Sequence, residues 1–462
     1  MKADVVEPSL YEVRQKIYPR AVGGWFAAWR WTLVWATQLA FYGGVWLTWN
    51  GRQMLLFDIA QRKFFIFGLV FWPQDIIYLA VLLILSAFSL FLFTAVAGRL
   101  WCGYACPQTV YTEIFLWVER RIEGDRAKQM RLDQQGFSAR KLFLKGAKHA
   151  AWIAIAMWTG FTFVGYATPI RELWAQVIAL SAGPWETFWI LFYGFATYGN
   201  AGWMREQVCK YLCPYARFQS AMFDRDTMVI TYDPGRGEPR GGRPRSADPK
   251  AIGLGDCVDC GICVQVCPTG IDIRKGLQYE CIGCAACVDG CDQVMDKMGY
   301  ARGLIRYSTT NALEKKLSRR QMLARVLRPR ALIYLFALGA IAIAAAASLW
   351  LRVPLKLDVI RDRAAIAREV EGGLIENVYR LQIMNTTEEA RAFEVSVSGI
   401  ASIRVAGEAT VGMPAASSRM VPLKVRIEPE RAKPGTHPIE FTVRTIGAGG
   451  VAVHEKSVFI VR

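Results

Sequence analysis

Five long apolar stretches alternate with polar segments along the chain. They lie near residues 28–48, 76–97, 150–168, 187–204 and 331–351. A helix needs about 20 mainly apolar residues to cross the hydrocarbon layer of a bilayer, so each stretch predicts a transmembrane helix. The fourth is the shortest and includes the glycine-rich sequence YGNAG. The pattern therefore predicts a multi-domain membrane protein built on an α-helical transmembrane bundle of about five spans.

The basic residues between these stretches predict the orientation of the bundle. Residues 98–147 carry nine lysines and arginines and residues 205–330 are also rich in both, whereas residues 50–74 carry three and residues 169–186 carry one. Lysine and arginine are enriched in cytoplasmic loops. We therefore expect the two basic segments in the cytoplasm and both short loops outside. The first 25 residues lack a signal-peptide layout, which places the N-terminus inside.

Beyond residue 352 the hydrophobic pattern changes from long runs to alternation. Apolar and polar residues alternate over 355–462, and turn residues interrupt the pattern about every ten positions. The clearest examples are VYRLQIM (378–384), FEVSVSG (393–399), VPLKVRIE (421–428) and IEFTVRT (439–445). Period-two segments of this length predict strands of a small antiparallel sandwich. We expect a C-terminal immunoglobulin-like β-sandwich on the outer side of the membrane.

Together these patterns divide the chain into five parts. They are a cytoplasmic N-terminal segment (1–27), a four-span membrane domain (28–224), a cytoplasmic linker with a cysteine-rich domain (225–330), a fifth transmembrane helix (331–351) and the outer sandwich (352–462).

Composition changes this picture only slightly. The chain has 462 residues, 53% of them hydrophobic, and a formal net charge of +17. Such a charge would ordinarily suggest nucleic acid. Here the basic residues flank apolar runs, so the expected partner is membrane lipid and no nucleic acid. The Gly/Pro/Arg-rich linker at 233–255 is expected to lie against the anionic inner leaflet.

The cysteines carry the clearest chemistry. There are twelve, all between Cys102 and Cys291. CVDCGICVQVCP (257–268) has the spacing C-x2-C-x2-C-x3-C-P, and CIGCAACVDGC (281–291) repeats it without the proline. In bacterial two-cluster ferredoxins, each run gives three ligands to one cluster and its fourth cysteine to the other. We therefore predict a bacterial-type ferredoxin module with two 4Fe–4S clusters, inserted into the membrane protein for electron transfer.

The spacing also predicts the ligands of each cluster. One cluster takes Cys257, Cys260, Cys263 and Cys291, and the other takes Cys281, Cys284, Cys287 and Cys267. Two zinc sites are the alternative, because C-x2-C is zinc spacing as well. Zinc would not require the third and fourth cysteine of each run.

The remaining four cysteines form an internal repeat. CGYACP (102–107) and CKYLCP (209–214) share cysteine, tyrosine, cysteine and proline, and each follows an even-numbered predicted span. Spacing of four would place both sulfurs on one helical face, and the proline would end or kink the span. If the two hairpins pack about a pseudo-two-fold axis, Cys102, Cys106, Cys209 and Cys213 converge, and we predict that they are catalytic and bind metal.

Three explanations of these thiols stay open. Soft thiolates suit Cu(I), a dithiol redox pair is a second possibility, and plain buried packing is the third. The four could surround one ion or act as two pairs. Three histidines and no C-x-x-C-H argue against haem, and no G-x-G-x-x-G follows a strand. Electrons must then come from a soluble donor, from quinol or through a cofactor site that the sequence does not reveal.

Several motifs resemble one family. WCGYACPQTVYTE, FGLVFWPQD, VCKYLCPYARFQSAMFD, YDPGRGEPRG, the eight ferredoxin cysteines and GLIRYST occur in this order, and the resemblance covers nearly the whole chain. They are similar to the cytochrome c oxidase accessory protein family called CcoG, FixG or RdxA. The resemblance implies a homodimeric cupric reductase of the bacterial inner membrane. It also implies that the Cu(I) product reaches copper chaperones and assembly factors of the cbb-type oxidase, with Cys102, Cys106, Cys209 and Cys213 as the membrane cysteines.

Two other functions compete with copper reduction. One is a quinol dehydrogenase like related membrane polyferredoxins that share the C-x3-C-P unit. The other is a non-enzymatic assembly factor whose sandwich docks on oxidase subunits while its clusters serve as a sensor or structural staple. The sequence does not identify the electron donor.

Overall fold

The computed structural model describes residues 16–249, 251–362, 367–431, 433–447 and 450–461. Most of the predicted N-terminal segment, residues 1–15, lies outside this range. The chain forms two compact units, one from residues 1–46 and 82–341 and one from residues 47–81 and 342–462. Each unit is described by itself.

Every predicted span is helical over most of its length. The helices are α1 (Trp25–Gly44), α2 (Ile76–Ala97), α6 (Ala139–Gly165), α8 (Pro184–Thr197) and α15 (Pro329–Trp350). Within the described residues, two helical stretches, Pro73–Ala97 and Pro329–Trp350, are long and apolar enough to cross a membrane. The count of five spans stays a prediction.

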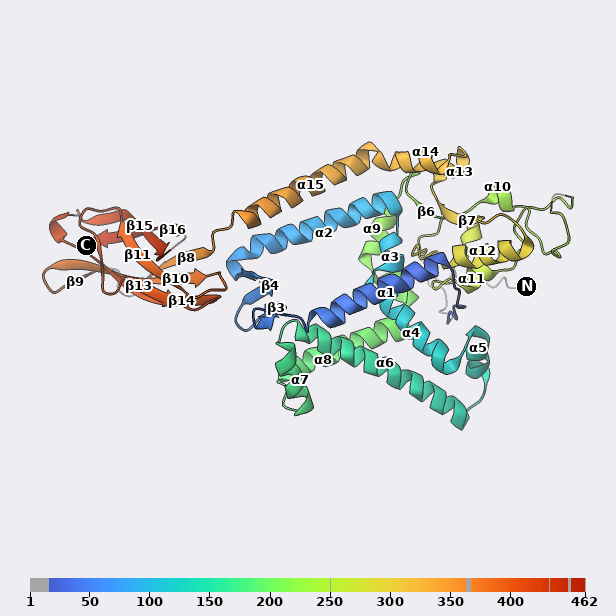
Figure 1. Cartoon of the computed structure of the whole chain (residues 1–462), viewed down its shortest axis with the longest axis horizontal. Coiled ribbons are helices and arrows are strands. Elements are labelled where there is room, and N and C mark those ends of the chain that lie inside the picture. The colour runs from blue at the N-terminus through green and yellow to red at the C-terminus, as the bar shows by residue number, and fades with distance from the viewer. Residues whose placement is uncertain (1–15, 250, 363–366, 432, 448–449, 462) are drawn as a thin grey trace, which may run out of the picture. The chain divides into compact units, whose positions relative to one another are not determined.

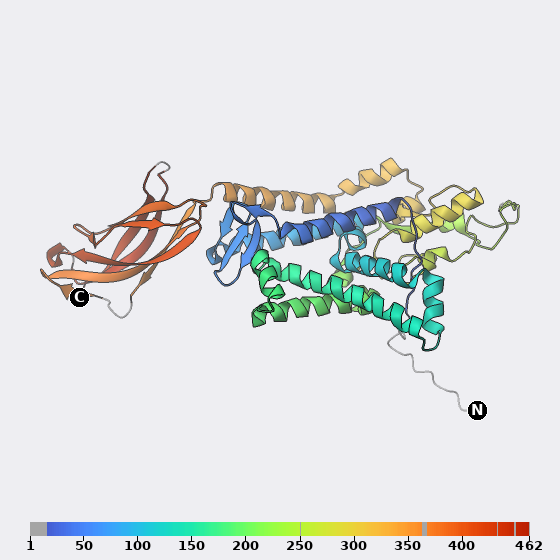
Figure 2. The same cartoon turned by 60° about the horizontal axis from the view of Figure 1, so that its bottom comes forward.

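Helices α2 and α15 run in opposite directions and touch at a few separate points. The hydroxyl of Tyr78 lies 3.0 Å from that of Ser348, and the rings of Phe88 and Tyr334 have centroids 6.5 Å apart. Arg328, just before α15, donates to the carbonyl of Ala95 near the end of α2. The helices α6 and α8 also run side by side (Figure 2).

Shorter helices connect the long ones in the first unit. They are α3 (Leu100–Tyr104), α4 (Pro107–Glu123), α5 (Arg126–Gln134), α7 (Ile170–Ile178), the π-helices η2 (Tyr198–Met204) and η3 (Val208–Leu212), and α9 (Pro214–Met222). The segment η2 continues α8, so the glycine-rich end of the fourth predicted span is π-helical. Single-turn π-bulges inside helices are often found at functional sites.

The cysteine-rich domain is held together by one strand pair. Strands β6 (Val229–Tyr232) and β7 (Ile305–Ser308) pair antiparallel. Between them lie α10 (Pro234–Gly237), α11 (Ile262–Gln265), η4 (Ile273–Lys275) and α12 (Ala286–Met298), and after them come α13 (Thr310–Glu314), α14 (Arg319–Ala324) and η5 (Arg325–Leu327). Figure 1 shows α11 and α12 beside these strands. Their shared core contains cysteines together with Ile230, Ile273, Val288, Met295 and Ile305.

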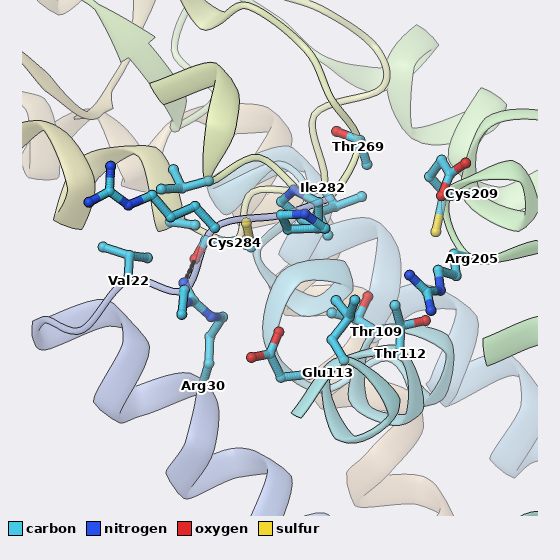
Figure 3. Close-up of a pocket in the computed structure, with 18 of the residues that line it drawn as sticks. Val22, Arg30, Thr109, Thr112, Glu113, Arg205, Cys209, Thr269, Ile282 and Cys284 are labelled. Atoms are coloured by element: carbon cyan, nitrogen blue, oxygen red, sulfur yellow. Dashed lines mark hydrogen bonds between the residues drawn. The ribbon is translucent and has the colours of Figure 1, made fainter. Parts of the chain in front are cut away.

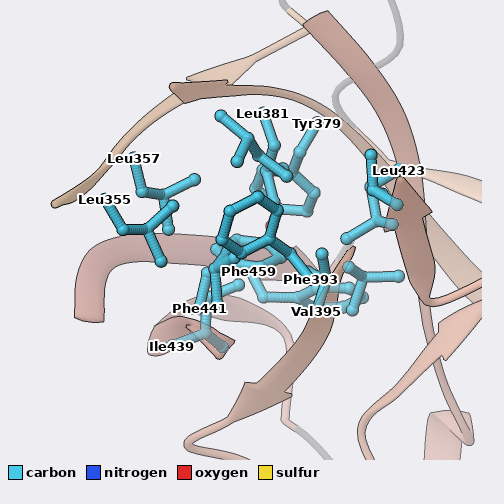
Figure 4. Packing of buried hydrophobic residues seen from close by; sticks show 14 of the residues in the cluster. Leu355, Leu357, Tyr379, Leu381, Phe393, Val395, Leu423, Ile439, Phe441 and Phe459 are labelled. Carbon is cyan, nitrogen blue, oxygen red and sulfur yellow. The ribbon is translucent and has the colours of Figure 1, made fainter. Parts of the chain in front are cut away.

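The predicted C-terminal β-sandwich is confirmed. One sheet has the order β12-β14-β10-β8, with β9 also pairing with β10, and the other has the order β13-β11-β15-β16. The strands are β8 (Leu355–Arg361), β9 (Arg368–Val370), β10 (Leu374–Asn385), β11 (Arg391–Ser398), β12 (Arg404–Ala406), β13 (Thr410–Met413), β14 (Ser417–Ile427), β15 (Gly435–Thr445) and β16 (Ala452–Val461). Inward-facing side chains such as Tyr379, Phe441 and Phe459 form its core (Figure 4).

The first short loop has more structure than the sequence indicates. Residues 47–75 contain β1 (Thr48–Trp49), β2 (Arg52–Gln53), β3 (Leu55–Asp58), β4 (Lys63–Ile66), β5 (Leu69–Phe71) and η1 (Pro73–Asp75). Strands β3, β4 and β5 form a sheet that packs with Met384 of the sandwich. The buried carboxylate of Asp75 pairs with Arg352 at 2.7 Å and with Lys356. This segment is thus part of the second unit.

Candidate iron–sulfur and thiol site

The two cysteine runs adopt matching backbone conformations. Residues at the third and fifth positions of each run have positive φ: Asp259 (51°) and Gly261 (64°) in the first, Gly283 (71°) and Ala285 (57°) in the second. Gly261 and Ala285 are also the N-caps of α11 and α12. Alternating left-handed residues turn the chain sharply between cysteines, so that all three side chains of a run face one space. Glycine adopts this conformation without strain.

Each run encloses a cavity with one cysteine from the other run. The first cavity is lined by Cys257, Cys260, Cys263 and Cys291. The second is lined by Cys267, Cys281, Cys284 and Cys287, and Cys263 lies at its boundary with the first. The structure thus brings together the two sets of four that the spacing predicts. Four thiols around an apolar cavity fit a 4Fe–4S cube, in which each iron takes one thiolate.

Burial shifts the pKa of a buried thiol in each cysteine run. Burial raises the pKa of Cys263 to about 11, although the charge of Arg274 opposes this shift. Burial likewise raises the pKa of Cys284 to about 11, against the charge of Arg30. Since the thiolate is the form that binds metal, occupying these cavities releases protons.

The second cysteine of each membrane pair lies outside a helix. Cys102 is in α3 and Cys209 is in η3, but Cys106 and Cys213 have extended backbones and are the N-caps of α4 and α9. The expectation that both sulfurs share one helical face is therefore wrong. The prolines that follow begin α4 and α9, because proline at the first helical position costs no hydrogen bond.

The first thiol pair packs directly against the second cysteine run. A Cβ atom added to Gly103 would lie 2.8 Å from the backbone N of Cys284. The thiols of Cys102 and Cys209 both contact an apolar cluster that contains Ile282 and Cys284. Only a glycine at position 103 permits this approach, which sequence reasoning did not anticipate.

Two glutamines hold the repeated motifs to each other. Gln108, just after the first C-x3-C-P, donates to the carbonyls of Asn200 (2.9 Å) and Arg205 (3.1 Å) ahead of the second. Gln219, fully buried in α9, accepts from the Cys102 thiol at 3.3 Å. Sequence reasoning missed both residues. The signal that could have found them is their place in the sequence: Gln108 lies two residues after Cys106, and Gln219 lies six residues after Cys213.

The four thiols are neighbours, both within each motif and between the two motifs. Cys209 lies close enough to Cys106 and Cys213 for their charges to interact, and Cys102 is in the same position relative to Cys106 and Cys209. Cys106 also lies near Cys213. In the described parts of the chain, no three His, Cys, Asp or Glu side chains are arranged to hold a single metal ion.

A polar cavity lies between the second cysteine run and Cys209 (Figure 3). Glu113 and Thr112 of α4 line it, and Arg30 donates to the Cys284 carbonyl at its edge. Arg205, at φ 41°, anchors its far side by donating to Glu119 at 2.9 Å. Small polar molecules can therefore reach both Cys284 and Cys209 from one space.

Family models match along most of the chain. The model for a 4Fe–4S dicluster domain matches residues 204–310, and that for a 4Fe–4S binding domain matches residues 79–124. The model for the Ig-like fold at the C-terminus of FixG matches residues 345–462. With the cysteine-lined cavities, these matches define an iron–sulfur oxidoreductase of electron transport.

Full-length relatives identify the family. The chain is 39% identical to the nitrogen fixation protein FixG of Rhizobium meliloti over 91% of this chain and 87% of that protein. It is 38% identical to protein RdxA of Cereibacter sphaeroides over 96% of this chain and 95% of that one. The chain therefore belongs to the FixG/RdxA family. A crystal structure of a FixG-related protein from Vibrio parahaemolyticus is also similar, with 22% identity over 23% of this chain and 95% of that one and a TM-score of 0.21.

Proposed function

We propose that this protein is a membrane-bound cupric reductase that supplies Cu(I) for assembly of the cbb-type cytochrome c oxidase. The observation that carries the proposal is the contact between the C-x3-C-P thiols and the second cysteine run. Cys102 and Cys209 pack on the same apolar cluster as Cys284. A thiol pair that touches a cluster-binding loop can hold a metal ion where it receives electrons.

The cluster ligands follow from the two cavities. Cys257, Cys260, Cys263 and Cys291 would hold one cluster, and Cys281, Cys284, Cys287 and Cys267 the other. The clusters would supply one-electron transfer. Arg274 and Arg30, which lie near Cys263 and Cys284, would offset part of the negative charge of the thiolates. Favourable charges near a cluster are among the features that set its potential.

The membrane thiols would bind copper as the substrate. One electron converts Cu(II) to Cu(I), and soft thiolate ligands favour the Cu(I) product. The neighbouring thiols of Cys102, Cys106, Cys209 and Cys213 would supply these ligands. Copper chaperones and oxidase assembly factors would then take up the product.

The membrane arrangement is part of the proposal. Besides α2 and α15, helices α1 and α8 expose large apolar side chains, among them Trp25, Trp35, Trp185 and Phe195. Exposed apolar surface of this extent requires a non-aqueous environment or a partner. We place α1, α6 and α8 in the bilayer as well, in a homodimer with the cysteine-rich domain in the cytoplasm and the sandwich in the periplasm.

The test uses the full chain, purified anaerobically and reduced with dithionite that is then removed. Cu(II) is added with a chelator selective for Cu(I), and the absorbance of the complex gives the rate. The double variant Cys102→Ser/Cys209→Ser should keep the iron and sulfide content of the wild type but lose most of the copper reduction. Each Cys→Ser change removes the soft ligand while the side chain stays nearly the same size.

The control variant separates the two sites. Cys291→Ser should lose about four of the expected eight irons per chain, because it removes one ligand of one cluster. A double thiol variant that holds its iron and reduces Cu(II) at the wild-type rate would contradict the copper-site assignment. Zinc in place of iron in the purified wild type would contradict the cluster assignment.

A further inference from the structure

A large, mainly apolar groove lies beside the second cysteine run, with Val288 in its lining. Its volume is about 1060 Å³, and its walls come from α1, α2, α3, α12, β7 and α14. Trp25, Trp29, Leu33, Phe93 and Trp101 line it from the helices. Ligand pockets of about 300–1,000 Å³ hold whole organic cofactors. The groove is therefore large enough for a lipophilic molecule with a ring and part of a chain.

Two tyrosines in the lining of the groove connect it to the cysteine run. Tyr104 of α3 and Tyr307 of β7 both line it. The Tyr307 hydroxyl donates to the carbonyl of Gly283 at 2.6 Å and lies 3.3 Å from the Tyr104 hydroxyl. Gly283 directly precedes Cys284, so a ring that contacts these tyrosines lies within one side chain of a predicted cluster ligand.

We propose that this groove binds an isoprenoid hydroquinone that donates electrons to the clusters. This inference rests on the proposed function in one respect: it names the electron donor for the proposed copper reduction. The apolar walls match an isoprenoid chain, and the two tyrosine hydroxyls, which can both donate and accept hydrogen bonds, match the oxygens of a hydroquinone ring.

The charged residues that line the groove are of both signs. They are Arg302, Arg306, Arg319 and Asp292. Arg302 pairs with Asp296 at 2.7 Å and Arg306 pairs with Asp233 at 2.8 Å, so two of the three arginines already have carboxylate partners. A hydroquinone carries no charge that must be matched.

The electron balance agrees with two clusters. Oxidation of one hydroquinone to quinone releases two electrons and two protons. Two clusters held by the eight cysteines would take up one electron each, and the protons would pass to water. Two Cu(II) ions, as the oxidant, would take these electrons, so one hydroquinone would yield two Cu(I).

The experiment measures binding and cluster reduction without copper. Decylubiquinone binding to the full chain in detergent is followed by calorimetry, and reduction by decylubiquinol is followed by the bleaching of cluster absorbance. Tyr307→Phe keeps the ring but removes one hydrogen bond, which should weaken binding and slow reduction about tenfold. Leu33→Trp should narrow the groove at the apolar wall and weaken both binding and reduction.

Controls make the result specific. Tyr193 lies on α8 outside the groove, and its ring centroid is 4.0 Å from that of Phe163. Tyr193→Phe should therefore bind decylubiquinone and be reduced by decylubiquinol as the wild type is. All variants should keep their iron and be reduced by dithionite at the wild-type rate.

Three outcomes would overturn the proposal. They are no binding of decylubiquinone, equal behaviour of Tyr307→Phe and Tyr193→Phe, and displacement of the quinone by phosphatidylglycerol, which would make the groove a phospholipid site. Failure here with intact copper reduction by dithionite-reduced protein would leave the proposed function standing. Cluster reduction by quinol without any copper reduction would support the quinol site and contradict the proposed function.

Discussion

The contact at Gly103 allows a sharp test of how the membrane thiols meet the second cysteine run. In Gly103→Ala the new Cβ would lie 2.8 Å from backbone atoms of Cys284, 0.6 Å closer than the 3.4 Å at which ordinary contact begins. Backbone atoms cannot rotate away, so α3 or the run must move. Overpacking of this kind costs about 1–3 kcal/mol. That corresponds to a change of about 5- to 150-fold in the equilibrium between the docked and separated arrangements.

The assay compares Gly103→Ala with Gly146→Ala in the same preparation. Gly146 lies inside α6, and a Cβ there would meet no atom within 4 Å. Alanine at that position should therefore raise stability by up to about 1 kcal/mol. Gly103→Ala should lose iron faster during anaerobic heating and should reduce Cu(II) more slowly. Equal iron retention and equal copper reduction in the two variants would refute the direct contact between α3 and the run.

Two further predictions concern the second unit. Asp75→Asn leaves Arg352 beside a neutral group in a buried position. The free energy of unfolding of this unit should therefore fall by about 3–5 kcal/mol, which a lower melting temperature would report. Burial opposes ionisation of Glu376, but hydrogen bonds from Arg368 and Arg426 outweigh it and lower its pKa. Its stabilising contribution is therefore full above the unfolded value of about 4.3 and is lost as the pH falls through the folded value. Glu376→Gln should melt with a weaker dependence on acid pH.

The parts of this protein that the sequence could predict are those set by local spacing. The longer strands of the sandwich alternate with period two over seven or more residues. β10 and β15 contain their named segments, and β11 and β14 contain all but the last residue of theirs. The two cysteine runs repeat one short geometry, so their grouping around two cavities was predictable as well. In both cases the residues that decide the structure are near one another in the chain.

The parts that could not be predicted depend on distant contacts or very short elements. Strands β3, β4 and β5 have three or four residues each, too few for a period to be visible, and are stabilised by Met384 far along the chain. Proline after Cys106 is compatible with ending one helix or beginning another. Only the packing of α4 against its neighbours decides between the two.

Gln108 and Gln219 show that the positions of the membrane thiols depend on contacts between the two repeated motifs and not on either motif alone. Gln108 of the first motif donates to backbone ahead of the second, and Gln219 beyond the second accepts from the thiol of the first. Each copy therefore needs the other to position its cysteines. Because Gln219 is fully buried, replacing it would leave the Cys102 thiol without its acceptor and disturb both motifs together. A repeat that is only weakly visible in sequence is thus a single interlocked structure, set directly against the iron–sulfur module.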